Sequence, residues 1–414
     1  MRPLLEVADL SIRFGTRTVV SNVSFSIVAG ECLAIVGESG SGKSVTARSL
    51  LGLAGPGSLV EASTLRFDDT AILDASRRQL RSLRGQEIGF VSQAALQALD
   101  PLRPIGREVA DALRLHTTMG ASDRAQRAIE LLAEAGLPEP ALRAAQRPDE
   151  LSGGMRQRAV IASAIALRPR LLIADEPTTA LDTTVQARIL ELLERLRASG
   201  TAILLISHDL AVVNRIASQI AVMRGGRIIE SGPTKAVLSA PQHPYTRSLL
   251  AAIPAARPRG SRLAPSAAAA VALARSPVRG TVSGSGTAPG PGTASDDSVL
   301  VARGLTRRFG SRLAVDNVNF RLRRGETLGV VGESGSGKTT VARLSLALDH
   351  PDAGDVELLG APWSSVTEGQ RRARRGRIGA IYQDALSSVD PRLTVGQILA
   401  DALSNGRSRK ITPA

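Results

Sequence analysis

The sequence predicts an α/β fold that is built on a phosphate-binding loop and is present twice, with the second copy incomplete. Residues 37–44 read GESGSGKS between an apolar run and a helical run, which is the setting that the pattern G-x-x-x-x-G-K-[ST] requires. The same pattern returns as GESGSGKT at residues 332–339. Because residues 30–50 realign as a whole with residues 325–345, the chain contains an internal repeat.

Each loop has the residue types that hold phosphate. Its glycines let successive backbone N–H groups turn inward, and the start of the following helix adds partial positive charge. In the first copy, Lys43 would reach the β- and γ-phosphates of a nucleotide, and the Ser44 hydroxyl would bind Mg²⁺. The other predicted contacts of the first loop are Gly37, Ser39, Gly40 and Gly42. The second loop offers Gly332, Gly335, Gly337, Lys338 and, as its Mg²⁺ ligand, Thr339. A glycine-rich turn that matches by chance is the alternative, and the recurrence of the pattern excludes it.

Length and composition limit the class of protein. A chain of 414 residues suggests two to three domains, and 43% hydrophobic residues are enough for packed cores. The net charge of +14 is compatible with nucleic acid, anionic lipid or a solvated arginine-rich surface. We favour the solvated surface, because no basic stretch contains the aromatic residues that single-strand binding uses.

The single cysteine, Cys32, excludes a disulfide framework and an all-cysteine metal site. With no signal peptide and no membrane-spanning run, we expect a cytoplasmic protein.

Short strands surround the first loop. Residues 5–30 alternate apolar and polar side chains as half-buried strands do, which predicts a small antiparallel β subdomain. Phe14 could stack on an adenine ring or belong to the core. Residues 87–93 predict a strand that ends at Gln93, whose carboxamide could serve Mg²⁺ and an attacking water.

A helical subdomain follows these strands. Residues 94–151 are mostly helical in pattern, with one helix expected to begin at Ser122 and Asp123. Residues 151–155 (LSGGM) begin another helix, where a serine cap and two glycines would leave the first N–H groups open to an anion. The predicted anion contacts are Ser152, Gly153 and Gly154. An ordinary capped helix explains the same residues equally well.

Two buried strands then end in polar residues, at the edge where open α/β sheets bind ligands. The first ends in Asp175, suited to Mg²⁺, and Glu176, suited to polarising the water that attacks a γ-phosphate. A solvated strand end is the plainer interpretation of the two acids. The second strand leads to His208, which is placed to contact the γ-phosphate. Asp182 would cap the intervening helix and could also make a contact across the site.

In this order and spacing, the first copy resembles the nucleotide-binding subunit of an ATP-binding cassette (ABC) transporter over residues 3–254. The resemblance implies ATP and Mg²⁺ as cofactors, with Phe14 at the adenine position, Gln93 beside the metal, a signature at LSGGM, Glu176 as catalytic base, and Asp182 and His208 near the γ-phosphate. It implies as partners integral membrane permease subunits, an external solute-binding protein and another cassette that completes the ATP sandwich. No nucleic acid is expected. The protein would then lie at the cytoplasmic face of the cell membrane, bound peripherally.

The subfamily is suggested by residues 242–254, QHPYTRSLLAAIP. This segment is similar to the one that follows the core in ATPases of oligopeptide, dipeptide and nickel importers. The doubled chain resembles the members that fuse two cassettes. The resemblance therefore implies import of peptides or nickel.

The second copy departs from the family's pattern. It offers Phe309 at the adenine position and Gln383 as a metal ligand. It contains no counterpart of the LSGGM signature, of the strand that ends in two acids, or of His208. In the family's core sheet the missing strands lie between the two that remain, so these two would lack partners. We therefore divide the chain into a complete cassette at 1–254, a flexible Ala/Pro/Gly/Ser linker at 255–297, a partial cassette at 298–403 and an unmatched tail at 404–414.

Two other functions remain open at this point. One is a non-transport cassette ATPase of DNA repair or translation, although such proteins usually carry zinc cysteines or charged helical linkers. The other is an inactive truncated or frameshifted product of a tandem-cassette ATPase. Neither ATP site has all its predicted groups within one chain: the first lacks a facing signature, and the second lacks its own acids and histidine. We therefore expect ATP hydrolysis only where the first cassettes of two chains pair, with Ser152 of each facing Lys43 of the other.

Overall fold

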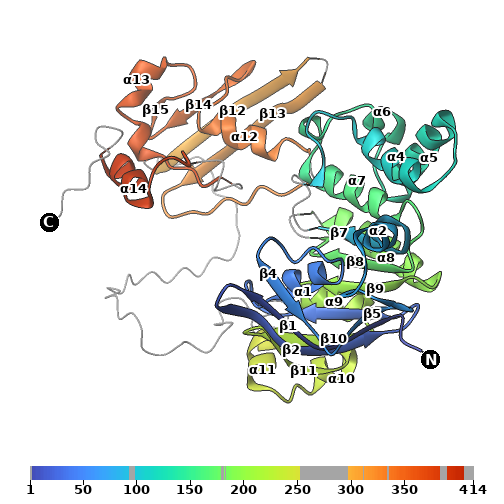
Figure 1. The fold of residues 1–414 in the computed structure, drawn as a ribbon. Helices are drawn as coiled ribbons and strands as arrows, with labels where there is room; N and C mark the ends of the chain where they lie inside the picture. The colour runs from blue at the N-terminus through green and yellow to red at the C-terminus, as the bar shows by residue number, and fades with distance from the viewer. Residues whose placement is uncertain are drawn as a thin grey trace. The chain divides into compact units, whose positions relative to one another are not determined.

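The computed structural model describes residues 2–92, 98–178, 181, 183–251, 297–310, 312–332, 335–382 and 389–404. Within these residues the chain forms two compact units, Met1–Pro277 and Val278–Ala414 (Figure 1). The first unit contains the first phosphate loop, and the second unit contains the repeat.

The centre of the first unit is a six-stranded sheet in the order β11-β10-β3-β9-β8-β7. All neighbours are parallel except β10 and β11, which form a hairpin. The strands are β3 (Cys32–Val36), β7 (Ile88–Val91), β8 (Leu171–Asp175), β9 (Ala202–Ile206), β10 (Gln219–Arg224) and β11 (Arg227–Pro233). Strands β3, β8 and β9 are buried along their whole length, which explains their continuous apolar sequences.

Both faces of this sheet are covered, and each face has its own apolar cluster. Alternate residues of β3 point to opposite faces: Cys32 and Ala34 to one cluster, Leu33 and Ile35 to the other. The first cluster includes helices α8 (Thr183–Ala198) and α9 (Leu210–Ile216). Cys32 is fully buried in this core, and the burial raises the pKa of its thiol to about 12.

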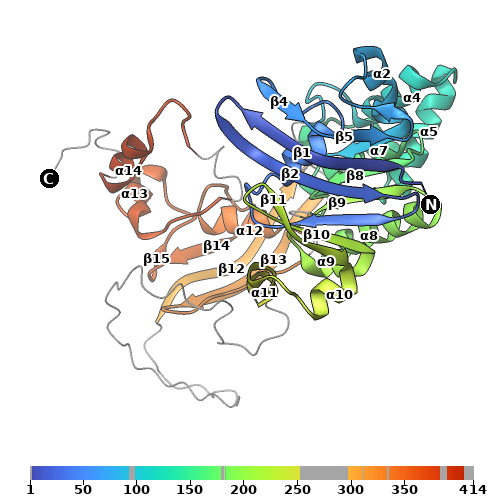
Figure 2. The ribbon, with the colours of Figure 1, turned by 60° about the horizontal axis from the view of Figure 1, so that its bottom comes forward.

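The second face is covered by helix α1 (Lys43–Ser49) and by an antiparallel sheet. Its order is β2-β1-β5-β6, with β4 also pairing with β1. Figure 2 shows β1 and β2 running across the core sheet. The strands are β1 (Leu5–Phe14), β2 (Arg17–Ile27), β4 (Ser58–Glu61), β5 (Thr64–Phe67) and β6 (Thr70–Ala71). The alternation predicted for residues 5–30 is confirmed, since Leu10 and Ile12 are fully buried.

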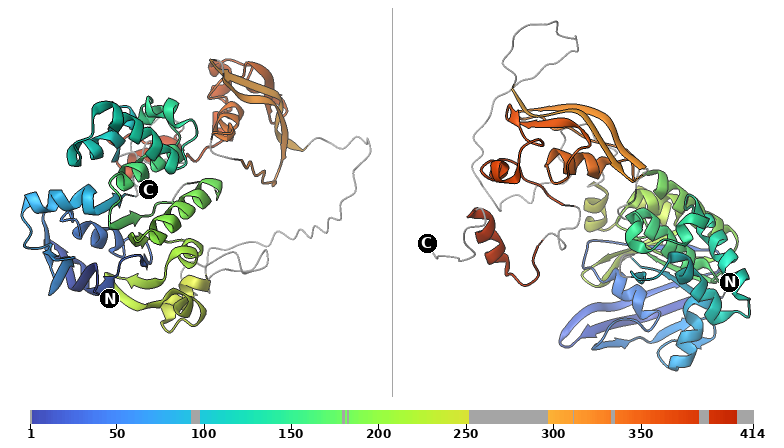
Figure 3. Two further views of the ribbon diagram at one scale, coloured as in Figure 1. Left: turned by 90° about the vertical axis from the view of Figure 1, so that its right-hand side faces the viewer. Right: turned by 90° about the horizontal axis from the view of Figure 1, so that it is seen from above.

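The helices of residues 105–165 gather at one end of the first unit (Figure 3). They are α4 (Ile105–His116), α5 (Ala121–Glu134), α6 (Pro140–Ala144) and α7 (Gly153–Ile165). The predicted start of α5 was wrong in detail: the helix begins at Ala121 after Gly120, with no side-chain cap, and Ser122 and Asp123 lie in its first turn. The first unit also contains α2 (Arg77–Ser82), α10 (Thr234–Ser239) and α11 (Pro244–Ala251), together with the short helical turns η1 (Leu83–Glu87) and η2 (Pro148–Glu150).

In the described residues of the second unit, the repeat forms one antiparallel sheet. Its strands lie in the order β13-β12-β14-β15. They are β12 (Ser298–Phe309), β13 (Arg312–Arg323), β14 (Ala353–Leu358) and β15 (Ala361–Pro362), and the helices are α12 (Lys338–Ser345), α13 (Glu368–Arg372) and α14 (Val395–Leu403). The core comprises Leu300, Ala302, Leu305, Val315, Val341, Leu344, Ala347, Val356, Leu358 and Trp363.

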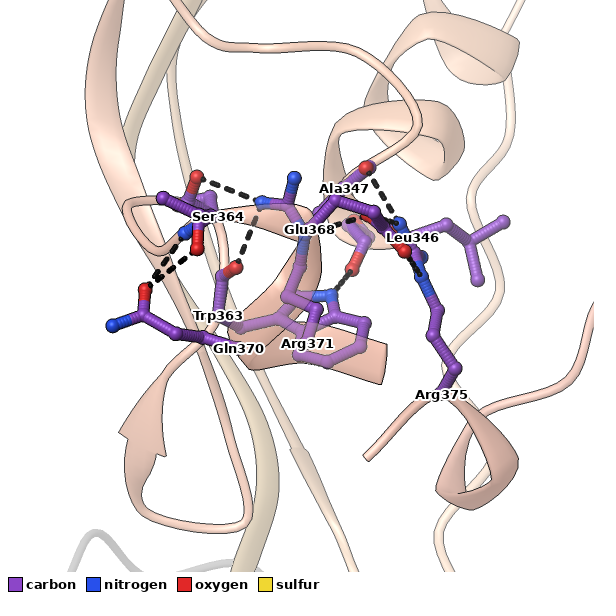
Figure 4. Close-up of polar contacts among 10 residues, drawn as sticks. Leu346, Ala347, Trp363, Ser364, Glu368, Gln370, Arg371 and Arg375 are labelled. Carbon is purple, nitrogen blue, oxygen red and sulfur yellow. Dashed lines mark hydrogen bonds and ion pairs between the residues drawn. The ribbon is translucent and has the colours of Figure 1, made fainter. Parts of the chain in front are cut away.

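Trp363 is the largest side chain of this small core and is fully buried. Its indole N–H donates to the Ser345 carbonyl of α12 at 3.1 Å, and the Arg375 guanidinium lies 5.1 Å from its ring centroid. Arg371 is buried beside it and donates to the Trp363 carbonyl at 3.2 Å (Figure 4). Glu368 binds both arginines. Together these contacts tie α13 and α12 to the sheet.

The two segments of the second unit that correspond to core strands do not form strands. Residues 326–332 and 378–382 have no assigned secondary structure in the described part of the chain. Val331 is 93% exposed and Ile381 fully so. In the first unit, β8 and β9 lie between the corresponding strands β3 and β7, so the structure agrees with the expectation that the two segments lack partners.

Candidate nucleotide site

The glycines of the first loop are required by its geometry. Gly37, Gly40 and Gly42 have φ values of 150°, 80° and 101°, which favour glycine. A Cβ on Gly37 would also lie 2.0 Å from the carbonyl oxygen of Met223. A Cβ on Gly42 would press on the Val19 carbonyl at 3.1 Å. The loop is therefore held against β10 and β2, while Gly40 faces open space.

Lys43 is the first residue of α1 and is buried beneath this loop. Its ammonium donates to the carbonyl oxygens of Gly37 at 2.8 Å and Glu38 at 2.7 Å. Burial lowers the pKa of Lys43, and the nearby carboxylates of Glu176 and Asp175 oppose that shift. The loop thus encloses one positive charge close to two acids.

Ser44 and Asp175, both predicted to serve Mg²⁺, contact each other directly. Asp175 ends β8, and its Oδ1 accepts a hydrogen bond from the Ser44 hydroxyl at 3.0 Å. The carboxylate is buried, and that burial raises its pKa. A hydroxyl beside a carboxylate is an oxygen donor set of the kind that Mg²⁺ uses in phosphate sites.

Glu176 and His208 meet at the same edge of the sheet. His208 Nδ1 lies 3.2 Å from Glu176 Oε1, and the side chains are 61% and 14% exposed, respectively. The Glu176 N–H donates to the Ile206 carbonyl at 2.9 Å, which anchors it to the end of β9. Its φ of 51° lies in the left-handed region, so the carboxylate is held on an unfavourable backbone.

The signature residues lie at the start of α7. Ser152 is the N-cap, and its Oγ accepts a hydrogen bond from the Met155 N–H at 3.4 Å. A Cβ on Gly153 would meet nothing within 4 Å, whereas one on Gly154 would lie 3.2 Å from the Leu181 side chain. The capped-helix interpretation is therefore correct for Ser152, and the exposed face at Gly153 leaves the anion role open.

The remaining predicted contacts of the first cassette are less well defined. Phe14 is half-buried at the end of β1 and packs against the core cluster on that face. Ser39 is exposed on the loop. Gln93 and Asp182, together with Gln383 of the second copy, lie outside the described residues.

The second loop repeats part of the first. Lys338 donates to the Gly332 carbonyl at 2.7 Å, and Gly335 and Gly337 have φ values of 84° and 92°. Thr339 is exposed on α12. Phe309 is 50% exposed, with the Arg307 guanidinium 5.1 Å from its ring centroid. In the described residues no acid-tipped strand stands beside this loop.

One contact of the first loop was not anticipated. The Tyr245 hydroxyl accepts a hydrogen bond from the Glu38 N–H at 3.1 Å. The only signal in the sequence was the HPYT segment itself, which gave a subfamily and no role. These two residues are 207 positions apart, and no spacing rule connects them.

A parallel sheet with a glycine-rich phosphate loop after one strand and acidic residues after another defines a P-loop nucleoside triphosphatase. The family described as "ABC transporter" matches residues 20–179 and 315–412, and the family described as "Oligopeptide/dipeptide transporter, C-terminal region" matches residues 229–280. The chain belongs to the ABC transporter family and is an ATPase of the ABC type.

Named relatives are similar over nearly the whole chain. The chain is 41% identical to the peptidoglycan transport ATP-binding protein YejF of Agrobacterium fabrum, covering 97% of this chain and 71% of that protein. It is 37% identical to the oligopeptide transport ATP-binding protein OppD of Mycobacterium tuberculosis, with coverages of 100% and 78%. It is 36% identical to the glutathione import ATP-binding protein GsiA of Escherichia coli O157:H7, with coverages of 97% and 67%.

A solved structure supports the fold. The dimeric cassette MJ0796 in a post-hydrolysis state, bound to ADP and Pi, superimposes with a TM-score of 0.51 at 30% identity. It covers 56% of this chain and is itself covered over 98% of its length. Among the described residues of our chain, no helix is both long and apolar enough to cross a bilayer.

Proposed function

We propose that the first cassette binds ATP with Mg²⁺ and hydrolyses it, and that this hydrolysis energises the import of peptide compounds through membrane partners. The observation that carries the proposal is the set of groups at one edge of the core sheet. Lys43 and Ser44 begin the helix that follows β3, Asp175 and Glu176 lie at the end of β8, and His208 follows β9. Ser44 contacts Asp175 at 3.0 Å, and His208 lies 3.2 Å from Glu176.

Each group has a chemical role that suits its surroundings. Lys43 would keep its contact with the Gly37 carbonyl and turn its other N–H donors to the β- and γ-phosphate oxygens of ATP, which would favour its charged form. Ser44 and Asp175 would hold Mg²⁺, which neutralises charge on the phosphates when bound. Glu176 would accept the proton of the attacking water, and His208, whose Nδ1 lies 3.2 Å from Glu176 Oε1, would orient that carboxylate toward the γ-phosphate.

A second cassette is needed to close the site. The exposed glycine face at Gly153 and the cap at Ser152 would supply N–H and hydroxyl donors to the γ-phosphate held by another cassette. The related MJ0796 structure is a dimer of cassettes. We propose that two first cassettes from two chains pair in this manner. Gln93, Asp182 and Phe14 would have the roles predicted from the sequence. Phe309, Gln383 and the second loop would at most contribute to nucleotide binding and would not take part in hydrolysis.

The cargo and the membrane partners follow from the relatives. YejF, OppD and GsiA are named for peptidoglycan, oligopeptides and glutathione, and all three contain amide-linked amino acids. The importer C-terminal region at residues 229–280 supports the same class. We propose permease subunits and a solute-binding protein as partners, with the chain bound at the cytoplasmic face of the membrane.

The central test measures ATP binding and hydrolysis on full-length variants. Lys43→Ala removes a charged donor and should weaken ATP affinity by at least tenfold, whereas Lys338→Ala should change total binding little. Glu176→Gln should keep binding and lower turnover by about a hundredfold or more. Glu194→Gln is the matched control. Glu194 forms an ion pair with Arg215, with 2.8 Å between the charged atoms, and this pair is not part of the site. Unchanged turnover in Glu176→Gln, or equal losses from Lys43→Ala and Lys338→Ala, would contradict the proposal.

A further inference from the structure

The segment QHPYT at residues 242–246 has no task in the function proposed so far, yet the structure ties it firmly to the cassette. Glu230 of β11 accepts hydrogen bonds from the N–H groups of Gln242 at 2.7 Å and His243 at 3.1 Å. His243 Nδ1 in turn accepts from the Tyr245 N–H at 3.1 Å. The start of α11 is therefore fixed to the β10–β11 hairpin before Tyr245 is reached.

Tyr245 projects from this anchored segment to the phosphate loop. Its side chain is 6% exposed, and the Arg224 guanidinium lies 4.7 Å from its ring centroid. Arg224 ends β10, the strand that pairs with β3 immediately before the loop. The ring is thus clamped between α11 and the hairpin. Burial is the main cause that raises the pKa of Tyr245, so the phenol stays neutral at physiological pH.

The hydroxyl of Tyr245 reaches one particular peptide group. It accepts from the Glu38 N–H at 3.1 Å, and that N–H belongs to the peptide whose carbonyl is Gly37 O. The same Gly37 carbonyl accepts from the Lys43 ammonium at 2.8 Å. Tyr245 and Lys43 therefore hold opposite ends of one peptide group. Because a peptide plane rotates as a unit, fixing its N–H also fixes the direction of the carbonyl that receives the lysine.

Other contacts hold the loop on either side of the Glu38 N–H. The Ser41 carbonyl accepts from the Gly226 N–H at 3.1 Å, and Gly37 packs against the Met223 carbonyl. Without the tyrosine oxygen, the Glu38 N–H would lose the hydrogen-bond partner that the structure provides for it.

We propose that Tyr245 is a positioning residue. It fixes the orientation of the Gly37–Glu38 peptide group and thereby the position of the Lys43 ammonium, so that the segment at residues 242–246 increases the affinity for the phosphates of ATP. This inference rests on the proposed function of the Lys43 loop. A Tyr245 that served only as core packing would stabilise the fold through its ring, and its hydroxyl would have no effect on nucleotide affinity.

The test is Tyr245→Phe in the full-length chain, which keeps the ring and removes the oxygen. Amide hydrogen exchange at Glu38 should become faster without nucleotide, and the Kd for Mg-ATP should rise about two- to tenfold, the range for one lost hydrogen bond. Binding is measured in a Lys338→Ala background so that only the first loop contributes. The matched control is Tyr382→Phe, since Tyr382 is the other tyrosine, lies in the second unit and is 49% exposed.

The outcomes separate this inference from the function on which it rests. Unchanged Glu38 exchange, or faster exchange with an unchanged Kd, overturns the positioning role while ATP binding stands. Absence of Lys43-dependent ATP binding in the Tyr245-containing protein overturns the proposed function and the inference with it. Should Tyr245→Phe unfold, as judged by far-UV circular dichroism, Arg224→Gln releases the same ring and must raise both quantities for the inference to survive.

Discussion

Residues 30–44 and 325–339 are nearly the same sequence in two different surroundings. In the first unit, Cys32–Val36 form a fully buried strand between β9 and β10. In the second unit the corresponding residues 327–331 form no strand and are exposed. The glycine conformations nevertheless agree, with φ of 80° and 101° at Gly40 and Gly42 and of 84° and 92° at Gly335 and Gly337.

The difference separates local from tertiary causes of structure. The glycine turn makes its hydrogen bonds within a few positions, and helix α12 keeps its cover because Val341 and Leu344 pack in the core of the second unit. A central parallel strand needs partners on both edges and cover on both faces. Residues 327–331 of the repeat keep the sequence of such a strand, but the described residues of the second unit contain no strand that corresponds to β9 or β10. Each prediction below tests this contrast.

The largest effect should be in hydrogen exchange. Amides of Ala34 and Ile35 in β3 should exchange more than a thousandfold slower than those of Gly329 and Val330, because opening of a core strand approaches global unfolding whereas an unpaired segment is barely protected. Mass spectrometry of peptic fragments gives both values in one experiment. Similar protection in the two segments would mean that the second copy finds partners in solution.

A core truncation should affect only the unit that contains it. Leu344→Ala, at a fully buried position in α12, should cost the second unit about 2–5 kcal/mol. Trp363 is the only tryptophan of the chain and is buried in that unit, so the denaturation midpoint of intrinsic tryptophan fluorescence reports this loss. The control is Leu131→Ala, at a fully buried position in α5 of the first unit. A fluorescence midpoint shifted equally by both variants would show that the units unfold as one.

Equivalent arginines let the two units be compared directly. Arg84 donates to the Leu51 carbonyl at 2.9 Å and 2.6 Å, and Arg375 donates to the Leu346 carbonyl at 2.5 Å. Alanine at either position should cost about 1.5–3 kcal/mol in its own unit, the range for hydrogen bonds from a charged group. Arg375→Ala should be the more harmful, since Arg375 also binds Glu368 and contacts the Trp363 ring. The reverse order, measured by circular dichroism for Arg84→Ala and fluorescence for Arg375→Ala, would contradict this account.

The smallest effect should be a pH dependence confined to the second unit. Hydrogen bonds from Arg375 and then Arg371 lower the pKa of Glu368 from 4.5 to about 2. A depressed carboxyl pKa contributes stability that is present above pH 4.5 and is lost as the pH falls toward about 2. The fluorescence midpoint should therefore fall less steeply with acidification in Glu368→Gln. Identical slopes would show that solvent screens this exposed carboxylate.

Much of the first unit was predictable because burial on both faces leaves continuous apolar runs, and the acids and histidine after them mark the strand ends. That order placed these residues at one edge of the sheet, whereas the contacts of Ser44 with Asp175 and of Glu176 with His208 were not predicted. For the second unit, the sequence predicted that the two remaining core strands would lack partners, but not that these two segments would form no strand.

Long-range side-chain contacts were not predictable. Tyr245 reaches Glu38 only because the β10–β11 hairpin and α11 return to the loop, and the sequence carries no period that reports this path. Trp363 likewise gave no signal, because a lone aromatic residue does not reveal what surrounds it. The start of α5 was misplaced because a serine and an acid within the first turn resemble a cap.

At Glu176 the residue type that suits the backbone differs from the one that the proposed chemistry requires. With a φ of 51° it occupies a conformation that costs most residues roughly 1–2 kcal/mol and glycine almost nothing. A random library screened only for resistance to heat should therefore enrich glycine or asparagine there, whereas a library screened for growth on peptides should retain the carboxylate. Under the proposed role of Glu176 as the base, selection for heat resistance alone would remove ATP hydrolysis while it kept the fold.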